Sequence, residues 1–270
     1  MSNTGNQSPR MFSPAQIAEN YLNIGVNKVR QNPLSAFLLA VMAGMMIALA
    51  GAAATVGSAA IENPSAAKLI SAAIFPAGLV MVLIGGSELF TGNCMLVIPL
   101  GKNRITFGEM MKSWAIVYGG NLVGGLLVSA LFVYSHTPSL FGGKLAAVIT
   151  ATAAAKCTLS FGDALMRGIL CNLLVCLGVW LSFAATDIAG KVIGCYLPVF
   201  AFVVAGYEHC IANMYYIPAG IFTAGEYGLT APGLSFGAMA VNNLIPVTIG
   251  NIIGGSLLVG GIYGLAYLRK

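Results

Sequence analysis

The sequence has very few charged residues. Only 8% of its 270 residues are Asp, Glu, Lys or Arg, and 58% are hydrophobic. A typical soluble domain has about a quarter of its residues charged. Eight acidic and thirteen basic residues cannot cover a compact body of this size in water, whereas hydrocarbon requires no polar cover. The composition therefore excludes an ordinary soluble domain and predicts an integral membrane protein.

Residues that carry enzyme or metal chemistry are also scarce. The sequence has two histidines, and its six cysteines show no CxxC or Cys/His ligand spacing and lie mostly in apolar runs, as small buried residues do. It has no Gly-rich phosphate loop, no Ser/His/Asp set and no pair of axial histidines. We therefore expect no enzyme activity, no cofactor and no metal. We also expect no nucleic-acid partner, because the net charge of +5 reflects membrane topology.

Long apolar segments are abundant. A helix needs about 20 apolar residues to cross a bilayer, and six segments qualify: 35–60, 69–100, 108–135, 164–186, 192–222 and 240–267. Residues 1–30 form a polar N-terminal segment without an early hydrophobic run, so we expect no cleavable signal peptide. The predicted fold is an all-α membrane protein with six transmembrane helices in one domain, residues 31–268.

The distribution of basic residues predicts the orientation in the membrane. Six spans place both termini on one side, and cytoplasmic loops are enriched in Lys and Arg. Nine basic residues fall on the side of the termini: Arg10, Lys28, Arg30, Lys102, Arg104, Lys112, Lys191, Arg269 and Lys270. Four fall on the other side: Lys68, Lys144, Lys156 and Arg167. We expect a multi-pass protein of the inner (plasma) membrane with cytoplasmic N- and C-termini.

The chain contains a weak internal repeat. Gly, Glu and Asn occupy the same three places in Gly86–Asn93 and in Gly206–Asn213. Two Gly-Asn-rich segments, Gly120–Val128 and Gly250–Val259, match at nearly the same offset along the chain. Three spans are an odd number, so the second copy enters from the opposite side, as in many transporters. We expect a 3+3 inverted repeat over about 35–136 and 160–267, with Asn121 and Asn251 at close helix contacts.

Both repeats place a glutamate inside an apolar span. Glu88 and Glu208 are costly in hydrocarbon, and an intramembrane ionisable residue is a candidate functional group. The surrounding glycines favour unwound backbone, which is tolerated at membrane depth only inside protein or beside an aqueous cavity. We therefore expect the second and fifth spans to be interrupted. The glutamates, with Asn93 and Asn213, either serve function directly or bond the freed backbone amides.

His209 is the main candidate for a chemical role. It lies inside the second break, whereas His136 ends the third span as a solvated loop residue. An imidazole changes charge near neutral pH, so an anion and a proton can meet there. We take Thr91 as the repeat-related position near the first break, where its hydroxyl can donate to the same anion. The Gly/Ala/Thr-rich segment 141–161 is too polar for a seventh span and is interpreted as a re-entrant or interfacial element.

Three motifs, in this order, resemble the formate/nitrite transporter family over residues 12–268: Gly86–Asn93, Phe202–Met214 and Asn243–Gly255. The resemblance implies an aquaporin-like fold, a homopentamer with one pore per protomer, and transport of formate, nitrite or hydrosulfide. It implies that His209 is the central pore residue and Thr91 its partner in a mobile segment, 87–93. It further implies polar path residues Lys156, Asn172 and Lys28, and two constrictions, one of Leu89, Phe90 and Phe202 and one of Phe75 and Leu79.

Two mechanisms remain open at this stage. The anion is protonated near His209 and crosses as a neutral acid, or His209 stays neutral and only hydrogen-bonds the anion. Two rival functions also remain. A channel for a small neutral solute would need no titratable group at the break, and a membrane redox subunit would need axial ligands on facing helices.

Overall fold

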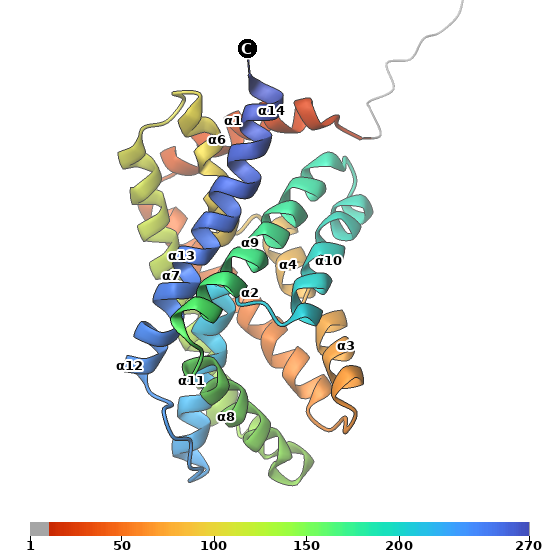
Figure 1. Cartoon of the computed structure of the whole chain (residues 1–270), viewed down its shortest axis with the longest axis vertical. Helices are drawn as coiled ribbons and strands as arrows, with labels where there is room; N and C mark the ends of the chain where they lie inside the picture. The colour runs from red at the N-terminus through yellow and green to blue at the C-terminus, as the bar shows by residue number, and fades with distance from the viewer. Residues whose placement is uncertain (1–10, 270) are drawn as a thin grey trace, which may run out of the picture.

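The computed structural model describes residues 11–269, and within this range it is helical apart from one isolated β-bridge between Met11 and Ala185. Most helices run along the long axis of the molecule (Figure 1). The N-terminal helix α1 (Pro14–Arg30) and the last helix α14 (Ile262–Leu268) lie at one end, and α8 (Lys144–Cys157) lies at the opposite end. Both termini of the described chain are therefore on the same side.

Three spans are uninterrupted helices, and they match the predicted segments within three residues. They are α2 (Pro33–Ser58), α7 (Phe107–Tyr134) and α9 (Phe161–Ala184). Each begins directly after a side chain that accepts a hydrogen bond from the first-turn amides: Asn32, Thr106 and Ser160. Such caps satisfy amides that the helix itself cannot pair.

The final span is one continuous helix from Phe236 to Leu268 with two wide π-helical stretches. Its parts are α12 (Phe236–Ala238), η3 (Met239–Leu244), α13 (Ile245–Ile252), η4 (Ile253–Gly261) and α14. The prediction of a span at 240–267 is confirmed.

The second and fifth spans are interrupted, as predicted. The parts of the second are α3 (Pro64–Ile74), α4 (Ala77–Ile84), α5 (Phe90–Asn93), η1 (Cys94–Leu96) and α6 (Val97–Gly101). The fifth consists of α10 (Ile188–Ala205) and α11 (Cys210–Glu226). Gly86 and Gly206 turn the chain at φ +72° and +74°, a region that favours glycine. The unwound backbone is shorter than predicted, because helix resumes at residue 90 and at residue 210. Thr91 therefore lies in a helical turn rather than in a loop over 87–93.

The segment between the two halves contains α8, preceded by the irregular turn η2 (Thr137–Gly143). Seven helices within residues 11–269 could cross a membrane by length and composition alone, and Thr137–Cys157 is one of them. Leu140, Phe141 and Gly142 have non-helical backbone angles, so the continuous helix is only the 14 residues of α8. At 1.5 Å per residue, α8 is about 21 Å long and shorter than the hydrocarbon core of about 30 Å.

Small residues bring α2 against α7, and α9 against α13 and η4 of the last span. A Cβ on Gly124 would overlap the carbonyl oxygen of Val41, and a Cβ on Gly254 would overlap that of Ile169. The expected close packing of the Gly-Asn segments is thus present in both halves. The interrupted spans pack against these pairs, with α3 and α4 beside α2 and α10 beside α9.

Candidate functional site

A buried polar cluster surrounds the first helix break. The Lys28 ammonium, from α1, donates to both carboxylate oxygens of Glu88 at 2.8 Å. The Asn93 amide donates to the same carboxylate at 2.8 Å, and the Glu88 N–H donates to the Leu39 carbonyl. Glu88 is only 7% exposed, so these bonds compensate the loss of water around its charge.

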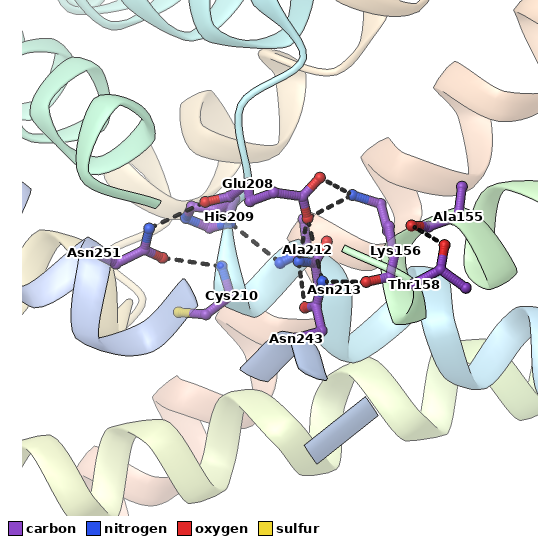
Figure 2. A network of polar contacts seen from close by, with 10 residues as sticks. All are labelled: Ala155, Lys156, Thr158, Glu208, His209, Cys210, Ala212, Asn213, Asn243 and Asn251. Carbon is purple, nitrogen blue, oxygen red and sulfur yellow. Dashed lines mark hydrogen bonds and ion pairs between the residues drawn. The ribbon is translucent and has the colours of Figure 1, made fainter. Parts of the chain in front are cut away.

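The second break repeats this cluster with different residues (Figure 2). The Lys156 ammonium, from α8, donates to both Glu208 oxygens at 2.9 Å, and the Asn213 amide donates at 2.7 Å. The Glu208 N–H donates to the Arg167 carbonyl, which is equivalent to the Leu39 carbonyl of the first half. Asn243 extends the cluster, because its oxygen accepts from Asn213 and its amide donates to the Lys156 carbonyl.

An asparagine holds the freed backbone at each break. The Asn251 amide donates to the carbonyls of Gly168 and Glu208, and its oxygen accepts from the Cys210 N–H at 2.9 Å. Asn121 makes the corresponding bonds in the first half, to the carbonyls of Ala40 and Glu88 and from the Phe90 N–H. The prediction assigned these asparagines to helix packing. They also satisfy backbone groups that a broken helix leaves unpaired.

Equivalent contacts give α1 and α8 corresponding positions in the two halves of the chain. Asn121 binds the carbonyl of Ala40, and Asn251 binds that of Gly168. Lys28 precedes Ala40 in the chain at the same spacing at which Lys156 precedes Gly168. Each half therefore uses a lysine from a helix outside its long spans to pair the glutamate at its break.

The two breaks meet at a direct contact between Thr91 and His209. Thr91 Oγ1 lies 2.9 Å from Nε2 of His209, and both residues are buried. Nδ1 of His209 accepts the N–H of Ala212, in the first turn of α11. In a neutral imidazole the proton is then on Nε2, which donates to Thr91. The threonine hydroxyl keeps its own proton for another acceptor.

The repeat is not symmetric at this contact. With Glu88 and Glu208 in register, His209 corresponds to Leu89, and Thr91 corresponds to Ile211. The interpretation of Thr91 as the repeat-related position of His209 is therefore off by two residues. The second half supplies the imidazole and the first half supplies the hydroxyl. The site therefore has one imidazole–hydroxyl contact, whereas a symmetric repeat would have two.

Two open cavities lie on either side of this pair. The Lys156 vestibule has a volume of about 400 Å³ and reaches His209, with Phe75 and Phe202 in its wall. The Lys28 vestibule has a volume of about 650 Å³ and is lined by Lys28 and Glu88. Between it and the centre lies a gap of only about 40 Å³, lined by Leu79 and Leu89. Such a gap has room for about one water molecule.

The apolar residues expected at constrictions are grouped differently from the prediction. Phe75 and Phe202 pack edge to face with ring centroids 5.8 Å apart, on the Lys156 side. Leu79 and Leu89 line the narrow gap on the Lys28 side. Phe90 contacts Trp114 and Tyr118 of α7 instead and lines none of these three cavities.

Asn172 is fully buried and binds the backbone of Thr91. Its amide donates to the Thr91 carbonyl at 3.2 Å and to the Asn251 carbonyl at 2.7 Å, and it lines none of the three cavities. Its role as a polar path residue stays a prediction, and the contacts of its amide fix the backbone that carries Thr91.

Sequence reasoning missed several residues of this region. Asn243 begins the third motif but was given no role of its own, and Tyr21, an uncharged residue of the polar N-terminal segment, was not singled out. The Tyr21 hydroxyl donates to the Gly92 carbonyl at 3.4 Å, beside Thr91. Lys68 lines the Lys156 vestibule, although it had served only to predict orientation. Its position as a single charge at the start of an apolar segment was the available signal.

Comparison with known proteins shows which family the chain is similar to. Residues 15–265 match the family model described as "Formate/nitrite transporter". The chain is 40% identical to "Formate channel FocA" of Escherichia coli (strain K12), over 96% of each chain. A solved "Pentameric formate channel with formate bound" is 35% identical, with a TM-score of 0.77 over 87% of this chain and 98% of its own. An "FNT family ion channel" is 27% identical, with a TM-score of 0.84 over 93% and 98%.

Proposed function

The chain belongs to the formate/nitrite transporter family, and on that premise we propose that it is a formate channel of the inner membrane. A chain 40% identical over nearly its full length is named a formate channel. One solved structure at 35% identity is described as a channel with formate bound. Formate is a small monovalent anion of a weak acid, and it is the substrate these relatives support above nitrite and hydrosulfide.

The observation that carries the proposal is the contact between Thr91 and His209 at 2.9 Å. It is a polar centre that the Lys156 vestibule reaches past the rings of Phe75 and Phe202, and a narrow gap lined by Leu79 and Leu89 separates it from the Lys28 vestibule. A hydrated ion does not pass such a narrow apolar gap without losing water, and that loss is costly for a charge. A small anion that exchanges water for the Thr91 hydroxyl recovers part of this cost at the centre.

We assign His209 the role of a neutral hydrogen-bonding partner. A proton on Nδ1 would displace the N–H of Ala212, which now donates to that nitrogen at 3.1 Å. It would also place a positive charge at the start of α11, where the helix dipole is positive. The local geometry thus favours the second of the two mechanisms left open by the sequence, in which His209 positions Thr91 and the anion without a proton transfer.

The further assignments rest on the same premise. We propose a homopentamer, since one of the matching solved channels is described as pentameric, and a channel rather than an enzyme. Cytoplasmic termini agree with the excess of basic residues and with α1 and α14 lying at one end. Lys28 and Lys156 serve the path indirectly, by neutralising Glu88 and Glu208. We further propose that each repeat begins earlier than expected and includes α1 or α8.

Reconstitution into liposomes tests the function. Formate should enter liposomes that contain the purified protein several-fold faster than it enters protein-free liposomes. The protein should also carry formate faster than nitrite or hydrosulfide. If His209 only hydrogen-bonds, wild-type flux should follow the formate concentration with little dependence on pH between 6 and 8.

Two results would contradict the proposal. Equal flux in protein-containing and empty liposomes would exclude formate transport. A steep pH dependence that disappears in His209→Phe would assign His209 the proton-donor role instead.

A further inference from the structure

Lys68 lies in the wall of the Lys156 vestibule. It belongs to α3, and the cavity of about 400 Å³ that it lines also contains Lys156, Glu208 and His209. Its Nζ lies 3.7 Å from the place that a Cβ on Gly206 would occupy. The ammonium is therefore held beside the turn that opens the second helix break, two residues before Glu208.

The charge of Lys156 is already compensated. Both Glu208 oxygens accept from its ammonium at 2.9 Å, and its side chain is only 16% exposed. An anion that entered the vestibule would compete with a buried carboxylate for this lysine. At distances that are large compared with this 2.9 Å separation, the two opposite charges nearly cancel.

Lys68 has no such partner in the part of the chain that the structure describes. The ion pairs found there join Lys28 with Glu88, His136 with Glu226, and Lys156 with Glu208. The only charged side chains that line the vestibule are Lys68, Lys156 and Glu208. Because the last two cancel, Lys68 supplies the net positive charge of the cavity.

The opposite vestibule has the same organisation. Lys28 is paired with Glu88, and Arg30 lines the cavity without an ion pair among residues 11–269. Each entrance therefore combines one lysine that is paired at the helix break with one basic residue that forms no ion pair within residues 11–269.

We propose that Lys68, rather than Lys156, is the residue that captures small monovalent anions in the Lys156 vestibule. This assignment rests on the proposed function. A charge in a cleft with low-dielectric walls raises the local concentration of ions of opposite sign. Lys156 keeps Glu208 and the second break in place, and Lys68 increases the rate at which anions enter.

Initial formate uptake into proteoliposomes tests the assignment. At low salt and at formate below its apparent KM, Lys68→Gln should lower the rate about 3-fold. Lys68→Glu changes the charge twice as much, so its rate should fall about 10-fold. The effect should shrink toward wild type in about 1 M salt, where charges are screened beyond about 3 Å. Flux at saturating formate should change little.

Two controls separate charge from structure. Lys68→Arg keeps the charge and should behave as wild type. Lys144→Gln removes an exposed lysine of α8 that does not line the vestibule, and it should also leave uptake unchanged.

The outcomes that overturn the assignment are distinct. If Lys68→Glu takes up formate at the wild-type rate at low salt, Lys68 is not the capture residue. The same holds if its uptake rate is reduced equally at low and high salt. In both cases formate transport itself still stands. Wild-type protein that carries no formate excludes both the assignment and the proposed function.

Discussion

Nε2 of His209 and Oγ1 of Thr91 are 2.9 Å apart, although 118 residues separate them in the chain. The contact joins the first turn of α5 to the residue that caps α11. Each of these two half-helices begins at an interruption, and the interruptions are held by the same type of lysine–glutamate–asparagine cluster. The polar centre therefore depends on both breaks being kept in register.

Removal of the Thr91 hydroxyl should impair transport. In Thr91→Val, which keeps the shape of the side chain, Nε2–H of His209 loses its acceptor, and an unpaired buried donor costs about 1–3 kcal/mol. An anion at the centre also loses the hydroxyl that would donate to it. We expect formate flux in liposomes to fall about 10-fold or more. Thr91→Ser keeps the hydroxyl and should retain most of the flux, and equal losses in both variants would exclude this role.

The ion pair between Lys156 and Glu208 should show strong coupling in a double-mutant cycle. Lys156→Gln leaves the buried Glu208 carboxylate without its cation, and such uncompensated charges cost about 3–5 kcal/mol. The double variant Lys156→Gln/Glu208→Gln removes both charges and should recover much of this stability. Thermal unfolding of the purified protein in detergent measures both. Purely additive losses would show that the two side chains do not depend on each other.

Asn251→Ala should destabilise the second break. The substitution removes three hydrogen bonds, two donated to the carbonyls of Gly168 and Glu208 and one accepted from Cys210. Because the freed groups are buried, we expect a loss of about 3 kcal/mol or more. Asn242→Ala on the same helix removes a single bond to the Cys157 carbonyl at an exposed position and should cost about 1 kcal/mol or less. A similar unfolding temperature for the two variants would contradict this.

Two glycines of α7 should respond oppositely to alanine. A Cβ on Gly124 would overlap the Val41 carbonyl, so Gly124→Ala should separate α2 from α7 and cost about 1–3 kcal/mol. A Cβ on Gly119 would meet no atom within 4 Å, and Gly119→Ala should stabilise the helix by up to about 1 kcal/mol. The unfolding temperatures of both variants check this prediction. An unchanged unfolding temperature in Gly124→Ala would mean that α2 and α7 can move apart at no cost.

Much of the architecture could be predicted from local features of the sequence. Apolar length places the six spans, because the bilayer requires about 20 apolar residues for each crossing. The pairs Gly86 with Gly206 and Glu88 with Glu208 predict the two interruptions, since glycine allows the turn and a carboxylate needs polar surroundings. The resemblance to a family of anion transporters, carried by three motifs, is confirmed over residues 15–265.

The division of roles within the site required the tertiary structure. Whether Lys156 or Lys68 is compensated depends on which of them reaches Glu208, and that follows from how α8 and α3 pack around the second break. Phe90 lies against α7 and away from the cavities for the same kind of reason. Composition and periodicity determine which residues enter the membrane, because burial in lipid depends on each segment separately. Contacts between segments that are far apart in the chain decide which polar groups are paired, and pairing determines whether a charge supports the fold or faces the path.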